Sequence, residues 1–246
     1  MKRTLISLVA LAAAVLAPVS QAQPVKWVAG KHYSIVPTQR TQVPAGQVEV
    51  MEVFSYGCPA CNQFRPVLRQ LKAALPKNAQ LVYLPASWNA AEAWPMFQRA
   101  YITAQSLGIA DKAHDPMYEA IWTTGELGIT EPGGRRLKTK LPTLDDAAKF
   151  YQRVAGVKAQ DFINASKSFS VDLKIKQAES QIKAMSITGT PTLVVNGKYR
   201  INNEAFRTTE EIIEAVNWLV AQESAAIAAK SAAKPAAAPA KPAAKP

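Results

Sequence analysis

The chain has 246 residues, of which 48% are hydrophobic, 19% charged and 8% aromatic, and its formal net charge is +11. This length and hydrophobic content allow one large domain or two modest ones, with a buried core. It excludes a collagen-like or wholly disordered chain, because glycine (11) is sparse and proline (17) only slightly enriched. Two cysteines are too few for a disulfide-scaffold mini-protein or a four-cysteine zinc site.

Residues 1–22 have the pattern of a cleavable export signal. Lys2 and Arg3 form a basic start, an apolar run covers 5–17, and small residues precede cleavage after Ala22. The run of thirteen residues is shorter than the roughly 20 that a membrane-spanning helix needs. We therefore expect a soluble mature protein in an oxidising compartment, the periplasm, where a cysteine pair can persist as a disulfide.

Residues 23–88 predict a unit of strand, helix and strand that contains both cysteines. The stretch QVEVMEVFS is dense in β-branched and aromatic residues, which is typical of a buried strand. The expected elements are a short strand at 32–36, a strand at 47–55, a helix from Cys58 to Pro76 and a strand at 81–85.

Residues 89–171 predict only helices. Apolar residues recur at helical spacing, and Thr143 with Asp146 three residues later has the pattern of a capping box. The expected helices cover 91–107, 112–123 and 144–154. This stretch is interpreted as an inserted all-helical domain.

Residues 172–223 predict a helix, a hairpin and a last helix. The runs TLVV and KYRI are joined by Asn196-Gly197, one of the stronger local hairpin signals. Thr208, with Glu211 three residues on, caps the last helix. Strands thus flank the helical block at both ends, which predicts an α/β fold with a helical insertion.

Residues 224–246 are rich in alanine, lysine and proline. They contain four lysines and no acid, and without them and the signal the net charge falls to +5. With almost nothing to bury, they are expected to form a disordered, partly extended tail. No nucleic-acid partner is expected of an exported protein; a solvated spacer and a weak attraction to anionic envelope surfaces both remain open.

Cys58 and Cys61 form a Cys-x-x-Cys pair at the junction of a strand and a helix. Zinc would need two more ligands, and the two histidines, His32 and His114, lie far away in the sequence; a c-type haem would need histidine where Asn62 stands. We therefore expect no metal. A structural disulfide remains open, although so short a loop constrains the unfolded chain little. A redox function fits better.

The helix start gives the two sulfurs different properties. Unpaired N–H groups and the helix dipole favour a thiolate at Cys58, whereas Cys61, one turn further, is more shielded. The dipole contributes about 0.3–2 kcal/mol, or at most about 1.5 pKa units. A strongly acidic thiol therefore needs added hydrogen bonds.

The segments FSYGCPACNQF and TGTPTLVVNGKY, together with the helical insertion, resemble the DsbA family of periplasmic thiol:disulfide interchange proteins over about residues 25–222. The resemblance implies a thioredoxin-like fold with an inserted helical domain. It implies that Cys58 is the exposed nucleophile and Cys61 the buried resolving cysteine, with Pro59 and Ala60 between them as part of the motif.

The resemblance also implies roles for three residues outside the cysteine motif. Thr190-Pro191 matches a cis-proline loop that takes up the substrate backbone, and the Thr190 hydroxyl is placed to reach the Cys58 sulfur. Glu52 matches a buried acid that tunes the site and relays a proton for Cys61. A carboxylate inside an apolar strand is costly unless paired or protonated, which predicts a raised pKa; a water-exposed glutamate at the strand edge is the alternative.

These features predict a dithiol oxidase that donates the Cys58–Cys61 disulfide to reduced, unfolded exported proteins. By resemblance, a DsbB-like membrane protein linked to quinone reoxidises it. No cofactor is expected, and the protein is expected to be a monomer. An isomerase is disfavoured, because no segment provides the dimerisation domain that is typical of isomerases. An isomerase or reductase of the same fold, or a peptide-binding module with a structural disulfide, remain as alternatives.

Ala60 stands where the best-known family members carry histidine, so a side-chain donor or cation is missing beside Cys58. The variant Ala60→His should therefore make the pair more oxidising, by about 30 mV for each unit by which the pKa of Cys58 falls. Redox titration against glutathione measures the change. An unchanged or lower potential would contradict this prediction.

Overall fold

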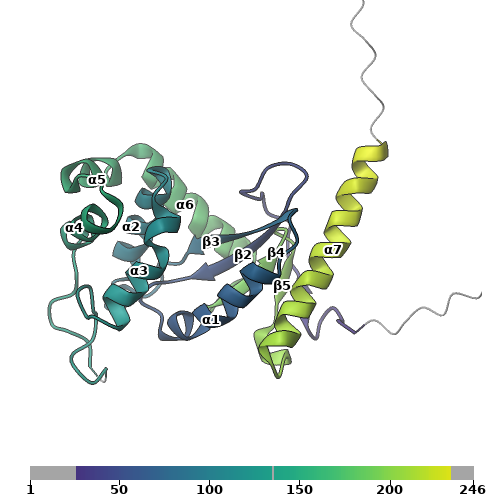
Figure 1. Ribbon diagram of the computed structural model, residues 1–246, viewed down its shortest axis with the longest axis horizontal. Coiled ribbons are helices and arrows are strands. Elements are labelled where there is room, and N and C mark those ends of the chain that lie inside the picture. The colour runs from purple at the N-terminus through teal and green to yellow at the C-terminus, as the bar shows by residue number, and fades with distance from the viewer. Residues whose placement is uncertain (1–25, 135, 234–246) are drawn as a thin grey trace, which may run out of the picture.

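The computed structural model describes residues 26–134 and 136–233 (Figure 1). The expected signal at 1–22 lies outside these residues and stays a prediction. Within them, none of the helices is both long enough and apolar enough to cross a membrane.

A five-stranded sheet forms the centre of the molecule, with strand order β1-β5-β4-β2-β3. The middle strand β2 pairs in parallel with β3 and antiparallel with β4, and all seven of its residues are buried. The strands are β1 (Tyr33–Ile35), β2 (Val48–Phe54), β3 (Ala79–Pro85), β4 (Thr192–Val195) and β5 (Tyr199–Ile201).

Seven α-helices surround the sheet in the described residues. In Figure 1, α1 and α7 lie along the sheet, while α2 to α5 gather beside one end of it. The helices are α1 (Pro59–Ala74), α2 (Trp94–Ser106), α3 (Ala110–Trp122), α4 (Leu144–Ala155), α5 (Ala159–Ser166), α6 (Phe169–Ala184) and α7 (Thr209–Ala233), with short 3₁₀ turns at Ala90–Glu92 and Asn203–Ala205.

Two apolar clusters cover different sides of β2. Val48 and Val50 pack with residues of α1 and α7, whereas Met51 and Val53 belong to the larger cluster that includes the helical block. Because side chains alternate along a strand, the single strand β2 joins both clusters. The expected α/β fold with inserted helices is confirmed; its boundaries at 89 and 171 stay a prediction.

Both expected capping pairs form. The Asp146 N–H donates to Thr143 Oγ1 at 3.3 Å while the Thr143 N–H donates to Asp146 Oδ2 at 2.9 Å. The Glu211 N–H donates to Thr208 Oγ1 at 3.2 Å at the start of α7. These contacts fix where two of the helices begin.

The expectation that an extended tail begins at residue 224 is wrong for residues 224–233. They continue α7 as helix to Ala233. The reason is local: this stretch is mostly alanine, the strongest helix former, and the first proline comes only at position 235. Residues 234–246 lie outside the described part of the chain.

Candidate active site

The turn between β2 and α1 holds the cysteine motif at the edge of the sheet. The Cys58 N–H donates to the Ser55 carbonyl at 3.1 Å, and the Gly57 N–H to Ser55 Oγ at 3.2 Å. Gly57 has to be glycine, because a Cβ there would lie 2.7 Å from both the Glu92 carbonyl oxygen and the Trp94 ring. Cys58 is the N-cap of α1, one position before the first helical residue.

The expectation that Cys58 is exposed is wrong, because its side chain lies within the site with only 6% of its surface exposed; it is a free thiol. Its pKa is lowered to about 6, mainly by a hydrogen bond with the Cys61 side chain, against the opposing effect of burial. The Thr190 side chain and the N–H groups of Cys61 and Ala60 also stabilise the thiolate. The added hydrogen bonds that a strongly acidic thiol requires are thus present.

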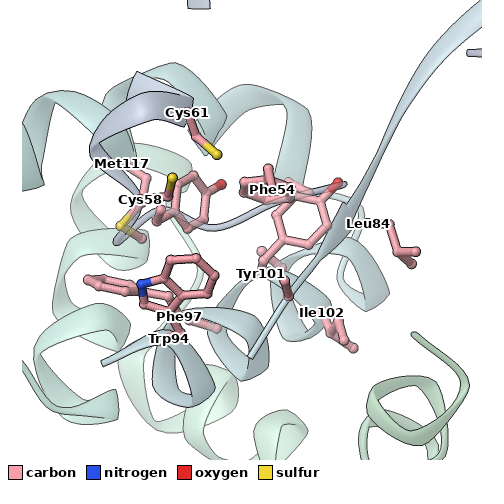
Figure 2. Packing of buried hydrophobic residues seen from close by; sticks show 14 of the residues in the cluster. Phe54, Cys58, Cys61, Leu84, Trp94, Phe97, Tyr101, Ile102 and Met117 are labelled. Carbon is pink, nitrogen blue, oxygen red and sulfur yellow. The ribbon is translucent and has the colours of Figure 1, made fainter. Parts of the chain in front are cut away.

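Cys61 has the opposite character. It is fully buried and a free thiol, and its pKa is raised far above the ordinary value by burial, by the hydrogen bond to Cys58 and by the charge of Glu52. A proton on this pair therefore stays on Cys61 while Cys58 ionises. Figure 2 shows the two sulfurs close together above Trp94 and Phe97.

The Thr190–Pro191 peptide bond is cis and borders the cysteines. The Cys58 thiol donates to the Thr190 carbonyl oxygen at 3.5 Å. A groove of about 520 Å³ lies beside this loop, lined in part by Thr190, Pro191 and Asn203. Asn203 Nδ2 donates to the Pro191 carbonyl at 3.2 Å and so holds the loop from the groove side.

Glu52 is fully buried at the middle of β2, between Tyr83 of β3 and Leu193 of β4. Neither of its carboxylate oxygens has a hydrogen-bond partner within residues 26–134 and 136–233. Burial, and then the charge of Cys58, raise its pKa well above the ordinary value. The water-exposed alternative is therefore wrong, and β3 carries no lysine to balance a carboxylate.

A family model described as Thioredoxin matches residues 43–215. A thiol:disulfide interchange protein DsbA from Pseudomonas syringae is 31% identical over 92% of this chain and 98% of the relative. This chain belongs to the DsbA family. The DsbA of Pseudomonas aeruginosa is 30% identical over 83% of this chain and 90% of its own length.

Solved DsbA structures share the fold. The crystal structure of DsbA from Xylella fastidiosa has a TM-score of 0.67 and 31% identity, and the match covers 80% of this chain and 98% of that one. For Pseudomonas aeruginosa DsbA the TM-score is 0.66 at 30% identity, over 81% and 96% of the two chains. The thioredoxin-like fold with an inserted helical domain is confirmed.

The helical block contacts the active-site turn directly, which sequence reasoning missed. Trp122 Nε1 of α3 donates to the Tyr56 carbonyl at 2.9 Å, and the Tyr56 hydroxyl lies 3.0 Å from His114 Nδ1. In the sequence of this DsbA-family chain, only the aromatic residues just before the cysteine motif indicate that the turn contacts other parts of the fold. Trp94 is buried in the same core, whereas Trp88 is 47% exposed.

No three histidine, cysteine or carboxylate side chains gather as metal ligands within the described parts of the chain. The sulfurs of Cys58 and Cys61 are redox-capable groups. The two sulfurs differ in acidity, as an exchange reaction requires. In a Cys58–Cys61 disulfide, Cys58 is the sulfur that leaves readily as a thiolate and Cys61 the one that does not.

The hydroxyl of Thr190 should lower the pKa of Cys58. The Thr190 hydroxyl oxygen is buried and has no hydrogen-bond partner among the described residues, where the neutral Cys58 thiol donates to the Thr190 carbonyl instead. Once Cys58 is ionised, this hydroxyl can donate to the thiolate, so in Thr190→Val the midpoint should rise by about one unit. Ultraviolet absorbance of the thiolate against pH measures this in the reduced protein. Thr192→Val is the matched control, since its hydroxyl donates to the Gly189 carbonyl at 2.8 Å in the same loop; equal midpoints in the two variants would refute the assignment.

Proposed function

We propose that the protein oxidises cysteine pairs in newly exported proteins by passing on a Cys58–Cys61 disulfide. The observation that supports this best is the asymmetry of the pair. Cys58 lies at the start of α1, where its thiolate is stabilised by several donors, whereas Cys61 is sealed beside Glu52. Membership in the DsbA family points to the same chemistry.

The reaction runs as two thiol–disulfide exchanges. A substrate thiolate attacks the Cys58 sulfur, forming a mixed disulfide, and Cys61 leaves and takes up a proton. A second thiolate of the substrate then attacks the substrate sulfur that is bonded to Cys58 in the mixed disulfide. The substrate disulfide forms, and Cys58 leaves as a stabilised thiolate. The substrate loses two electrons, and the protein ends as a dithiol with Cys58 ionised.

The low pKa of Cys58 drives this direction. A folded-state pKa below that of an ordinary thiol stabilises the reduced form. This stabilisation is complete when the pH is above the pKa of an ordinary thiol, and it is lost as the pH falls through about 6. At pH 7 it amounts to about 1.4 kcal/mol, or about 30 mV of oxidising potential. Further oxidising power has to come from strain or other contacts in the oxidised form.

Several parts of the site have a role in this scheme. Pro59 and Ala60 space the cysteines, and both are exposed beside the sulfurs. The Thr190–Pro191 loop takes up the backbone of the substrate, and Glu52 supplies the proton to Cys61. No cofactor is required, because the two sulfurs hold the electrons.

The compartment and partners follow from this chemistry. An oxidase works in the periplasm, which matches the export pattern of residues 1–22. Reduced unfolded proteins are the substrates, and a DsbB-like membrane protein linked to quinone is the reoxidant. The protein acts as a monomer.

Cys58→Ala should abolish oxidation of a reduced test protein, because the attacked sulfur is gone. Cys61→Ala should instead accumulate a mixed disulfide with a disulfide-bearing test protein, since Cys58 has no partner to resolve it. Non-reducing gels and mass spectrometry detect both outcomes. Retained oxidation in Cys58→Ala would end the proposal in favour of a binding module.

The resting redox state separates an oxidase from a reductase of the same fold. Trapping cell extracts with an alkylating reagent that adds mass to free thiols should find Cys58 and Cys61 fully oxidised. A reduced resting pair would support the isomerase or reductase alternative.

A further inference from the structure

Helix α6 presents two large apolar side chains to solvent near its start. Phe169, its first residue, is 80% exposed, the highest fraction for a large hydrophobic residue in the described part of the chain. Leu173, one turn further, is 43% exposed. Single exposed hydrophobic residues are common and need no explanation. Two of them four positions apart lie on the same face of a helix and form a continuous apolar surface.

This apolar surface lies opposite the side of α6 that packs into the core. With about 3.6 residues per turn, Phe169 and Leu173 share one line along the helix with positions 176, 180 and 183. The buried residues of α6 lie on the other side of the helix and are Val171, Ala178 and Ile182. A surface helix ordinarily carries polar residues at the centre of its solvent face. The fold itself therefore gives no reason for Phe169 and Leu173 to be apolar.

The second half of the same line is basic. Lys176 and Lys183 are both exposed, and neither forms an ion pair within residues 26–134 and 136–233. The two acids of α6, Asp172 and Glu179, lie off this line, and Asp172 pairs with Arg99 at 2.8 Å. We call Phe169, Leu173, Lys176 and Lys183 the α6 stripe. It combines two apolar side chains with two cations and contains no acid.

Neighbouring elements continue the pattern of the α6 stripe. A groove of about 810 Å³ runs between α6 and the segment that precedes β2. Among the residues that line it, Arg40 and Lys176 are charged, and both are cations. Leu107, at the end of α2, is 37% exposed, and its neighbour Ser106 accepts a hydrogen bond from Lys174 Nζ of α6 at 2.9 Å. Apolar and basic side chains thus extend over more than one helix.

The charge of the stripe determines which partner fits it. A second copy of the chain brings lysine against lysine whether the two helices run parallel or antiparallel, because Lys176 lies at the middle of the stripe. Residues 234–246 carry three lysines and no acid, so they are repelled as well. An anionic phospholipid bilayer offers what the stripe lacks, since phosphate groups lie at its surface and apolar chains directly beneath them.

We propose that the α6 stripe is a peripheral membrane contact that binds the surface of an anionic phospholipid bilayer. Phe169 and Leu173 enter the boundary between headgroups and acyl chains, and Lys176 and Lys183 bind phosphate groups. The stripe is about 21 Å long, at about 1.5 Å per residue. Because α6 and α1 pack against opposite faces of β2, a protein held by the stripe keeps the start of α1 open to solvent. The contact does not depend on the proposed exchange chemistry.

Co-sedimentation with vesicles tests the apolar part of the stripe. The wild type should bind vesicles made of equal parts of phosphatidylglycerol and phosphatidylcholine, and should bind phosphatidylcholine alone much more weakly. The double variant Phe169→Ser/Leu173→Ser should bind the anionic vesicles about tenfold more weakly, because less apolar surface leaves water on binding. Val28→Ser/Ile35→Ser is the matched control, since these side chains are 48% and 67% exposed outside α6; it should bind like the wild type.

A second pair of variants tests the basic part of the stripe. Lys176→Gln/Lys183→Gln should weaken binding about 25-fold at low salt, at about fivefold for each cation near an anionic surface. This loss should fade as salt is added, whereas the loss in the Phe169 and Leu173 double variant should persist. Lys112→Gln/Lys149→Gln is the matched control, because it changes the net charge equally at exposed positions of α3 and α4. Residues 234–246 are the same in every variant, so their lysines cancel in the comparison.

Equal unfolding temperatures show that the variants are folded, as expected of substitutions on a solvent face. A wild type that ignores anionic vesicles overturns the membrane contact, and so do stripe variants that bind like their controls; an acidic protein would then suit the stripe better than a bilayer. A wild type that binds the vesicles but fails to oxidise a reduced test protein leaves the contact standing and overturns only the proposed function.

Discussion

The start of α1 is the constraint on which the site depends. The first turn of a helix leaves backbone N–H groups without partners, and here the sulfur of Cys58 lies among them. A thiolate satisfies those donors better than a thiol or a disulfide sulfur does. The same feature therefore orders the turn and sets the direction in which electrons flow.

The rest of the fold keeps this helix start in place. The fully buried strand β2 fixes the position at which the turn begins, and Gly57 lets Trp94 press against it. Trp122 and His114 of α3 hold Tyr56 from the other side through its carbonyl and hydroxyl groups. The inserted helices thus support the geometry of the cysteines as well as enclosing a core of their own.

Local signals were sufficient to predict most of the elements and the cysteine motif. Strand β2, the hairpin at Asn196-Gly197 and the caps at Thr143 and Thr208 each follow from a few neighbouring residues. Helix α5 was missed because its eight residues give a short apolar pattern. The continuation of α7 was missed because the prolines further on outweighed the alanines before them.

Contacts between segments that lie far apart in the sequence could not be predicted from such local patterns. Glu52 and Thr190 were found through a family resemblance, since nothing near them in sequence shows that they meet the cysteines. His114 was weighed only as a metal ligand, because a single histidine carries no spacing pattern. Its position beside Tyr56 and Tyr83 depends on how α3 packs against the sheet.

Helix α7 also extends beyond the sheet at its C-terminal end. Glu223 ties the helix to the sheet through Asn196, Lys198 and Tyr199. Just after it, Ser224 accepts a hydrogen bond from Asn78 at 2.8 Å, and Ile227 packs against the apolar cluster that includes Val48 and Val50. The six further residues to Ala233 carry the helix about 9 Å beyond Ile227, and Figure 1 shows it projecting past the sheet. A dye attached to a side chain of this last helical turn is therefore held past the edge of the sheet, where it leaves the redox site open to large substrates.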